Sequence, residues 1–452
     1  MVAIYLWRRR RRGPAIDRAR RETGLLAPDP AADRRYDAAD TGGCDVPQDQ
    51  LLPSWVAGRA APRLDEHRSL NVMRLGFACS WEAQPELTWS HTPWNLRAAL
   101  NERVAVEDVG VQYPTLVRAS LKVLSAKRID GRWSSMWRHS RAARAYEERT
   151  IRRAVSGARL DALLQIQDLA RVDDLPYLLY QDLSYDVLLE RALQPGGMSH
   201  FPGLTIDAVR RLRDRQHDVY AGAAGLLTMS RWFADHLVTV SDVPAEKVHV
   251  VHPGASALAS AHPEHAATAH LRRMSGPRRR LLFVGKDFAT KAGEAVVGAL
   301  RLLRRDFDPE ITLTIVGPAT WPMAGPVPDG VDFRGRLPVA ELSAVYDEHD
   351  LFVLPSRFEG FGIVFVEALA RGLPVIGRQA FAMPEIITPG LNGDLVPEGK
   401  DDSDDLAKRV SVLLADDAVY ERVGASAADV ARHFSWNRAA DDVVEIARTV
   451  AP

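Results

Sequence analysis

The chain has very little cysteine and no long hydrophobic run. Its 452 residues include two cysteines, Cys44 in a polar segment and Cys79 in an apolar one, so the sequence predicts neither a disulfide framework nor a zinc cluster. This scarcity favours a reducing, cytoplasmic setting. No apolar run approaches the roughly 20 residues that span a bilayer. The arginines from Arg8 to Arg12 are not followed by the apolar stretch of a signal peptide.

An excess of charge of either sign is also lacking. The formal net charge is −1, which gives no electrostatic reason to expect a nucleic-acid partner. Hydrophobic residues make up 46% of the chain and charged residues 26%, a balance typical of a soluble globular protein. A chain of this length exceeds one compact core, so two domains of ordinary size are expected.

Residues 1–68 lack a sustained hydrophobic period and are rich in Arg, Ala, Asp and Pro. We expect a disordered tail or a misassigned start, because the segment from Met73 to Ala78 has the pattern of a natural first strand. The alternative is that the basic run docks on an anionic membrane. Contact with the inner face of the membrane therefore stays open.

After this tail, short apolar runs alternate with helical patterns in two successive series. The first series predicts strands at 73–79, 105–111, 162–165, 177–180, 225–229 and 248–251, with helices that include one starting at Thr92-Pro93 and others at 141–156 and 230–238. The second predicts strands at 281–284, 311–316, 331–333, 351–354 and 374–376, with helices at 292–304, 340–348 and 363–371. Such alternation is typical of parallel α/β sheets.

The two series predict an α/β protein with two doubly wound parallel-sheet domains. We assign the first domain to residues 69–255, a linker to 256–280, the second domain to 281–434 and a last helix to 435–452. Ligands bind such sheets at the carboxyl ends of the strands, so a site is expected in the cleft between the domains. His262, His265 and His270 fall in the linker, and we interpret them as solvated and expect no metal site.

The segment from Leu351 to Ile376 is the richest in candidate functional residues. A strand ends near Pro355, a loop with Gly360 and Gly362 follows, and a helix opens near Ile363. The glycines allow the backbone to approach a ligand closely, and the helix N-terminus favours a phosphate. Glu359 precedes that terminus.

A second carboxylate, Glu367, falls within the first turns of the same helix. A carboxylate on a buried helix face needs hydrogen-bond donors, and the two hydroxyls of a ribose are suitable. The alternative is that Glu367 is solvated or paired with Arg371. The surrounding motif favours the ribose.

A second cluster runs from Phe283 to Gly293. Lys286 and Lys291 bracket a loop between a strand and a helix, and together with the helix N-terminus they could cradle a diphosphate. No Walker loop is present, since no Gly-Lys-Ser/Thr closes the segment, and the three spaced glycines of a dinucleotide fingerprint are absent. Taken by themselves, two loop lysines are more often ordinary surface charge.

Together these motifs resemble retaining glycosyltransferase family four, known also as glycosyl transferases group 1. The resemblance covers roughly residues 73–450 and is densest in the second half. The matching features are Glu359 and Glu367 with seven residues between them, Pro355-Ser356, Gly360–Gly362, Gly372–Ile376, Gly285-Lys286 with Lys291, Val316-Gly317, Pro384-Glu385, Asn392-Gly393 and Phe434–Trp436.

The resemblance implies a GT-B fold, with two Rossmann-like domains facing each other across a cleft and a C-terminal helix crossing back to the first domain. It implies metal-independent transfer of a sugar from a nucleotide-diphosphate sugar to a hydroxyl of a carbohydrate, a lipid-linked or a small-molecule acceptor, with retention of anomeric configuration. No cofactor is then needed. The first domain would be the acceptor domain and the second the donor-binding domain.

The same resemblance assigns roles to individual residues. Lys286 and Lys291 would hold and neutralise the diphosphate, Glu359 would contact the transferred sugar, and Glu367 would bind the ribose. Further donor contacts are implied for the residues Gly360, Phe361, Gly362, Gly317, Arg336 and Leu337.

In the first domain the resemblance is looser. Ser90 and His91 lie in the loop after the first strand, where His91 stands in place of the usual glycine. Gln181 stands where many relatives have a histidine that contacts the sugar, and an amide cannot exchange a proton near neutral pH. The neighbouring Asp182 is a candidate general base, an acceptor contact or a turn-forming residue.

The stretch from Lys122 to Arg153 interleaves basic residues with Trp133, Met136 and Trp137. We expect a helix that packs on the first sheet with its arginines in water. A membrane-surface helix, suited to a lipid-linked acceptor, is the alternative.

Two other functions keep the same fold. One is a phosphorylase or a sugar-nucleotide hydrolase. The other is a non-catalytic carbohydrate-binding protein, which Gln181 and His91 would motivate.

Overall fold

The computed structural model of the chain describes residues 73–129, 132–194, 197, 201, 203–256, 263–399 and 402–451. The predicted tail at 1–68, with Arg8, Arg12 and Cys44, lies outside the described residues, and so does His262. The predictions made for them stay predictions.

The first domain is built on a six-stranded parallel sheet, with strand order β10-β9-β8-β7-β1-β3. Every residue of β7 and β8 is buried, as expected for parallel strands covered on both faces. The strands of the domain are β1 (Arg74–Ala78), β2 (Ser80–Trp81), β3 (Ala105–Asp108), β4 (Val111–Gln112), β5 (Ala126–Ile129), β6 (Arg132–Ser135), β7 (Ala162–Ile166), β8 (Tyr177–Gln181), β9 (Gly225–Thr228) and β10 (Val248–Val250).

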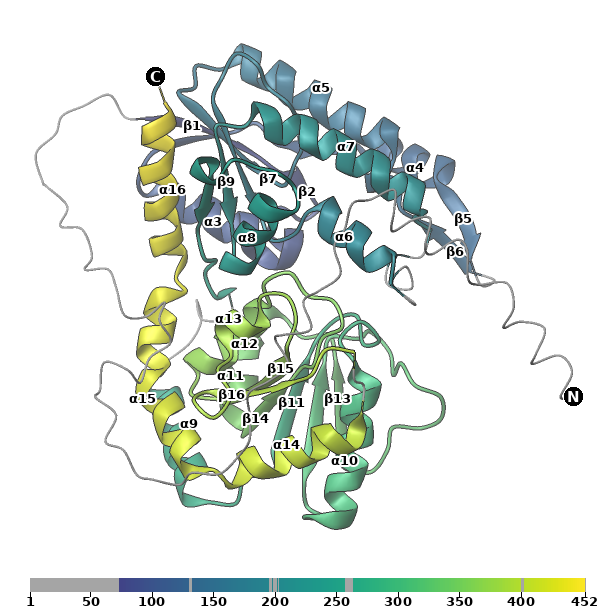
Figure 1. Cartoon of the computed structure of the whole chain (residues 1–452), viewed down its shortest axis with the longest axis vertical. Helices are drawn as coiled ribbons and strands as arrows, with labels where there is room; N and C mark the ends of the chain where they lie inside the picture. Colours follow the sequence, from purple (N-terminus) through teal and green to yellow (C-terminus); the bar gives the residue numbers. More distant parts are fainter. Residues whose placement is uncertain are drawn as a thin grey trace, which may run out of the picture. The chain divides into compact units, whose positions relative to one another are not determined.

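Helices cover this sheet, with α5 and α7 running side by side along one flank in the view of Figure 1. Four of them begin at a serine or threonine whose side chain accepts a hydrogen bond from the first turn, such as Ser140 before α5 and Ser230 before α8. The helices are α3 (Thr92–Asn101), α4 (Thr115–Leu124), α5 (Arg141–Gly157), α6 (Tyr185–Ala192), α7 (Ile206–Gly222) and α8 (Arg231–Thr239), with 3-10 turns η3 (Pro85–His91), η4 (Trp137–His139) and η6 (Ala245–Lys247).

The second domain is a six-stranded parallel sheet with strand order β13-β12-β11-β14-β15-β16. The chain order reverses between the neighbours β11 and β14, which is the topological switch point where doubly wound sheets bind ligands. The elements are α9 (Pro263–Ser275), β11 (Arg280–Val284), α10 (Gly293–Asp306), β12 (Thr312–Val316), β13 (Val331–Gly335), α11 (Val339–Glu348), β14 (Leu351–Val353), α12 (Ile363–Ala370), β15 (Val375–Arg378), α13 (Met383–Ile386), β16 (Gly393–Val396), α14 (Ser403–Ala415) and α15 (Asp417–His433).

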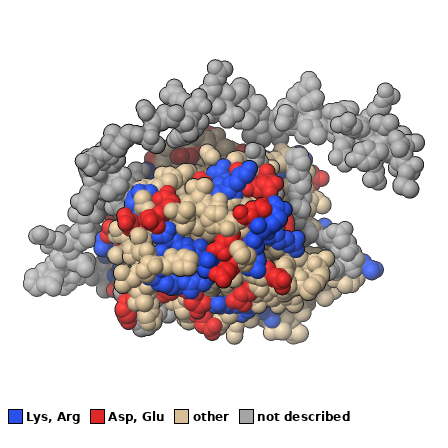
Figure 2. Space-filling model, turned by 90° about the horizontal axis from the view of Figure 1, so that it is seen from below, with Lys and Arg blue, Asp and Glu red and all other residues tan. Residues whose placement is uncertain are grey.

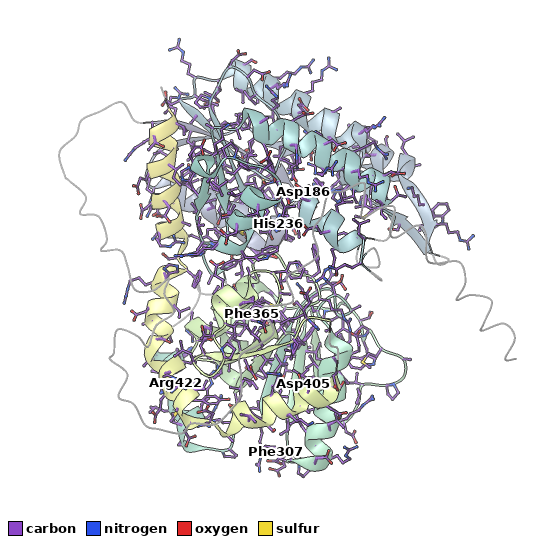
Figure 3. All side chains as sticks on the ribbon, viewed as in Figure 1. Asp186, His236, Phe307, Phe365, Asp405 and Arg422 are labelled. Atoms are coloured by element: carbon purple, nitrogen blue, oxygen red, sulfur yellow. The ribbon has the colours of Figure 1, made fainter. Side chains whose placement is uncertain are left out.

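Figure 3 labels one core side chain of the second domain and three side chains at its outer end. Phe365 of α12 is buried against Phe352, with ring centroids 5.5 Å apart. Phe307, Asp405 and Arg422 lie away from it toward the opposite end of the domain (Figure 3). The core therefore includes an aromatic pair beneath α12, the helix that carries Glu367.

The last helix, α16 (Trp436–Val450), packs against α3 of the first domain. Arg103 Nε donates to Asp441 Oδ1 at 2.5 Å, and the Gly254 backbone approaches Trp436 so closely that a Cβ there would lie 2.5 Å from the indole. This confirms the predicted return of the C-terminal helix to the first domain (Figure 1). The expected pair of doubly wound parallel sheets is confirmed as well.

The helix expected within the stretch from Lys122 to Arg153 is confirmed for its second part, which falls in α5, but is wrong for the part around Trp133. Helix α4 ends at Leu124, the antiparallel hairpin β5–β6 follows, and α5 begins only after Ser140. The side chain of Trp133 is 76% exposed, whereas Trp137 is buried edge-on against Tyr113 with centroids 4.8 Å apart. Arg and Lys favour a helix by intrinsic propensity, but propensity is a weak guide that tertiary context overrides, as in this hairpin.

Two other elements differ from expectation. The strand expected at 105–111 is divided into β3 and β4, because the Asp108 carboxylate accepts a hydrogen bond from the Gly110 amide at 2.9 Å and turns the chain. Helix α9, expected as a surface helix in a linker, buries Arg273, whose guanidinium donates to the carbonyl oxygens of Tyr346 and His349 at 2.8 Å. His265 and His270 both lie on this helix.

Candidate active site

The two loops at the switch point of the second sheet carry the predicted lysines and the first glutamate. Lys286 and Lys291 follow β11, and Glu359 follows β14, the neighbouring strand. Because the carboxyl ends of parallel neighbours meet at one edge of the sheet, residues distant in sequence lie close together there.

These loops line a cavity of about 410 Å³. Residues of both domains contribute to it, as predicted for a site in the cleft. The predicted site residues among its lining are Ser90, His91, Asp182, Lys286, Lys291, Gly317, Arg336, Leu337, Glu359, Phe361, Gly362 and Glu367. We call it the first cavity.

Lys291 and Glu359 form an ion pair in the wall of the first cavity. Lys291 Nζ donates to Glu359 Oε2 at 2.6 Å and to the Phe358 carbonyl oxygen at 3.3 Å, and Ser356 Oγ donates to the same carboxylate oxygen at 3.3 Å. Gly285 makes room for this lysine, since a Cβ there would lie 2.9 Å from Lys291 Cγ. A mobile anion that enters the cavity would compete with Glu359 for Lys291.

The amino end of α12 faces the first cavity. Its N-cap residue is Gly362, at a φ of 86° that favours glycine, and the first-turn residues Ile363 and Val364 line the cavity. The N–H groups of a first helical turn have no partner within the helix. Together with the two lysines, they give this part of the cavity the donors and positive charge that suit a phosphate.

Glu367 is buried one turn further along α12. It is 4% exposed, lines the first cavity and accepts a hydrogen bond from the Tyr346 hydroxyl at 3.0 Å. Burial and this carboxylate raise the pKa of Tyr346 well above its ordinary value, so Tyr346 stays a donor. Arg371, the alternative partner expected from sequence, forms an ion pair with Asp347, with its Nε 2.8 Å from Oδ1.

The floor of the first cavity is made by glycine backbone at the ends of β11 and β12. Gly317 has a φ of 124°, and a Cβ there would lie 2.5 Å from the Gly285 carbonyl oxygen. Only glycine allows this approach. Arg336 and Leu337, just after β13, line the cavity beside it.

The loop before α3 is strained. Trp89, Ser90 and His91 have φ values of 39°, 55° and 67°, a left-handed conformation that non-glycine residues rarely adopt. Ser256 Oγ donates to the Ser90 carbonyl oxygen at 3.4 Å and accepts from Asn95 at 3.0 Å, which helps hold the loop. Burial and the charge of Lys286 lower the pKa of His91.

Gln181 and Asp182 have different surroundings. Gln181 is 1% exposed, accepts from the Tyr220 hydroxyl at 2.8 Å and contacts Gln167. It is not among the described residues that line the first cavity, and nor is Gly360. Asp182 does line the cavity, and a Cβ on Gly360 would lie 2.1 Å from Asp182 Oδ2. Gly360 therefore makes room for Asp182 rather than lining the cavity.

Burial, followed by the nearby negative charge of Glu359, raises the pKa of Asp182 to about 7. The ordinary value for an aspartate is near 4. Asp182 is therefore a carboxylate that changes charge near neutral pH, at the boundary between the domains.

A second cavity of about 590 Å³ adjoins the first. It lies over the carboxyl ends of β1 and β7, where the chain order of the first sheet reverses, and Trp89 and Asp182 line both cavities. Its other walls include Arg138, Arg144 and Tyr185. These three residues were not identified as site residues from the sequence. They belong to no motif, and only their position on the elements next to the switch point could have indicated that they line a cavity.

The described residues show no large surface of one charge in the view of Figure 2, no metal-binding cluster and no membrane-spanning helix. Basic and acidic side chains lie next to one another on the face of the molecule seen in Figure 2. Within the described ranges, no group of three or more His, Cys, Asp or Glu side chains is arranged to hold a metal ion. Across the same ranges, every helix is too short or too polar to cross a membrane. Cys79 is buried, which raises the pKa of its thiol.

A family model described as glycosyl transferases group 1 matches residues 278–416, the stretch that carries the two lysines and both glutamates. Residues 278–416 are thus similar to this family. The resemblance drawn from the motif Glu359–Glu367 is thereby confirmed. A curated relative, the D-inositol 3-phosphate glycosyltransferase of Streptomyces bingchenggensis, is 31% identical over 249 residues, which cover 51% of this chain and 54% of the relative. The chain thus spans about half the length of this relative.

Solved structures extend the likeness from residues 278–416 to the whole fold. Sucrose-phosphate synthase from Thermosynechococcus elongatus has a TM-score of 0.59 at 16% identity, over 83% of this chain and 98% of that one. The Anabaena protein HepE, solved in complex with UDP and glucose, has a TM-score of 0.52 at 16% identity, over 83% of this chain and 99% of that one. The fold is GT-B, as the sequence motifs implied.

Proposed function

We propose that this protein is a retaining glycosyltransferase that moves a sugar from a nucleotide-diphosphate sugar to an acceptor hydroxyl without a metal ion. The observation that carries the proposal is that Lys286, Lys291, Glu359 and Glu367 all line one cavity between two parallel sheets. A surface role for the lysines would not bring them together with both carboxylates.

In this proposal the diphosphate lies between the two lysines and the amino end of α12. Negative charge grows on the diphosphate as the glycosidic bond breaks, and preorganised cations and N–H groups stabilise that charge. When the donor binds, Lys291 breaks its ion pair with Glu359 and pairs with the diphosphate. Glu359 is then able to contact the sugar. Its carboxylate then stabilises positive charge at the anomeric carbon.

The nucleoside end of the donor is held deeper in the second domain. Glu367 accepts hydrogen bonds from the ribose hydroxyls, with Tyr346 fixing its orientation. The base lies over the glycine floor at Gly317, beside Arg336 and Leu337. The HepE structure, which holds UDP and glucose, supports a nucleotide in a cavity of this fold.

The acceptor occupies the second cavity, with its reactive hydroxyl near Asp182. The hydroxyl oxygen forms a bond to the anomeric carbon while the bond from that carbon to the diphosphate oxygen breaks. Attack from the departing side retains configuration, and the hydroxyl proton passes to the diphosphate oxygen that leaves on that side. Asp182 accepts a hydrogen bond that orients the acceptor. The low cysteine content supports a cytoplasmic setting for this reaction.

A panel of UDP-, GDP- and ADP-sugars with candidate acceptors, assayed with and without EDTA, tests the proposal. We expect nucleotide release that requires an acceptor and persists in EDTA. Release without an acceptor would instead indicate a hydrolase, and binding without release a non-catalytic protein. Loss of turnover in EDTA that Mg²⁺ restores would overturn the metal-independent mechanism.

A further inference from the structure

The wall of the second cavity pairs each of its cations with a carboxylate. Arg138 Nη2 donates to Glu82 Oε1 at 2.8 Å, and Arg144 Nη1 lies 3.4 Å from Glu147 Oε2. Among the described residues that line this cavity, Arg138 and Arg144 are the basic side chains other than histidine. Their charge is thus already neutralised before a ligand enters.

The remaining carboxylates and the histidine of the wall leave no surplus of positive charge. Asp168 lines the cavity and pairs with Arg215, whose Nη1 lies 3.4 Å from Oδ2, while Asp182 stands at the junction with the first cavity. Burial and the charges of Arg144 and Arg138 lower the pKa of His139 to about 4, so His139 is uncharged near neutral pH. An anion that enters the cavity would therefore lie near carboxylates, and it would have to displace one of them to pair with an arginine.

The same wall offers donors and acceptors in alternation. Ser80 Oγ accepts from Arg138 at 3.0 Å and donates to Glu147 at 2.7 Å. The Tyr185 hydroxyl accepts from Arg144 at 2.7 Å and lies 2.9 Å from His139 Nδ1. A ligand hydroxyl is both a donor and an acceptor, so it can join such a network at either kind of group.

Aromatic rings also line the cavity. Trp89, Tyr185, Phe201 and Phe358 line it, and the rings of Phe201 and Phe358 meet edge to face with centroids 5.2 Å apart. Aromatic faces suit the C–H face of a sugar or cyclitol ring, while a volume of about 590 Å³ is in the range of small-ligand pockets.

We infer that the second cavity takes an uncharged polyhydroxylated ring as acceptor, such as a monosaccharide, a cyclitol or the end of a neutral glycan, and rejects its phosphorylated counterpart. The inference rests on the proposed function, since it names the acceptor class of that reaction. Glu82 and Glu147 act as specificity residues by neutralising the two arginines that a phosphate would otherwise use.

Matched acceptor pairs test the inference: myo-inositol against inositol 3-phosphate, and glucose against glucose 6-phosphate. With the active donor, we expect at least one uncharged member to be used with a kcat/KM about tenfold or more above that of its phosphorylated partner. We also expect its KM to be nearly independent of salt, because no net charge is attracted. Equal use or preference for a phosphorylated member would overturn the inference.

Ligand-observed NMR with the nucleotide-saturated protein gives a second measurement that does not need turnover. Binding of an uncharged ring to this complex supports the inference, and binding of only the phosphorylated members, or of neither class, overturns it. Nucleotide binding by thermal shift is measured beside it. If no nucleotide binds, the proposed function fails; if a nucleotide binds but phosphorylated acceptors win, only the inference fails.

Charge variants sharpen the test. Glu82→Gln leaves Arg138 without its carboxylate partner, so we expect the ratio of phosphorylated to uncharged acceptor use to rise about threefold or more. Glu82 is half-exposed, which limits the risk to folding. Glu246→Gln, at an exposed site in η6, is the matched control and should leave the ratio unchanged. An unchanged ratio in Glu82→Gln would contradict the role of the pairing.

Discussion

The groups that line the first cavity from the second domain come largely from two short stretches, residues 285–293 and 355–367, whereas those of the second cavity are scattered over loops and helices of the first domain. In the proposed function a diphosphate is bound by lysines, N–H groups and glycine backbone, which lie in the loops that follow neighbouring strands of one sheet. A polyhydroxylated acceptor needs many separate donors and acceptors, which one loop cannot supply. The proposed donor-side residues thus lie in compact sequence motifs, whereas the residues of the second cavity are brought together only by folding.

Removal of Lys291 should have the largest effect on the donor side. Lys291→Ala is expected to lower kcat, with a rise of roughly 2–4 kcal/mol in the activation free energy, because it removes a cation from the departing diphosphate. Steady-state kinetics with a saturating acceptor measures this loss. Lys408→Ala, at an exposed lysine of α14, is the control. Normal turnover in Lys291→Ala would mean that the diphosphate is bound elsewhere.

Glu367→Gln should separate binding from chemistry. The amide keeps the size of the side chain but weakens the acceptor of the ribose hydroxyls, so donor affinity is expected to fall by about 1–3 kcal/mol with a smaller change in kcat. Calorimetry with the nucleotide diphosphate measures the affinity. A loss confined to kcat would contradict the proposed ribose contact.

Gly360→Ala tests the contact between the two sides. A Cβ at this position would lie 2.1 Å from Asp182 Oδ2. This overpacking is expected to lower the free energy of unfolding by about 1–3 kcal/mol. The double variant Gly360→Ala/Asp182→Gly should recover part of the stability lost in the single variant. Equal melting temperatures of the wild type and Gly360→Ala would show that the loop adjusts freely.

Asp182→Asn should have the smallest effect on rate and a distinct effect on pH dependence. The carboxylate form of Asp182 increases as pH rises through about 7, so the wild-type kcat should rise over that interval, while the Asn variant should lose about 1 kcal/mol and this pH step. A pH–rate profile of both proteins measures it.

The same variant should be more stable than the wild type at alkaline pH. The pKa of Asp182 is higher in the folded protein, about 7, than its ordinary 3.8, so ionisation opposes folding as pH rises from 3.8 to 7. The gain in melting temperature of Asp182→Asn should accordingly be larger at pH 8 than at pH 5. A gain that is equal at both pH values would contradict the raised pKa.

Elements with a strong local pattern could be predicted from sequence. The apolar run at 281–284 and the helix after Gly362 lie within a residue or two of their expected bounds, because a fully buried strand and an N-cap glycine leave few alternatives. Within the stretch from Lys122 to Arg153, the helix at 141–156 was predicted but the hairpin β5–β6 before it was not, since its basic residues show no alternation of buried and exposed positions.

The sequence by itself determined the two parallel sheets and singled out the proposed donor-side residues Lys286, Lys291, Glu359 and Glu367, because hydrophobic period, glycine position and loop charge act over short stretches. Tertiary structure decided what those groups touch. Two contacts join segments that are far apart in the chain: Lys291 with Glu359, and Asp182 with Gly360. Folding also leaves Gln181 outside the lining of the first cavity. Burial and neighbouring charge then set the proton affinity of Asp182, and both arise only when the two domains come together.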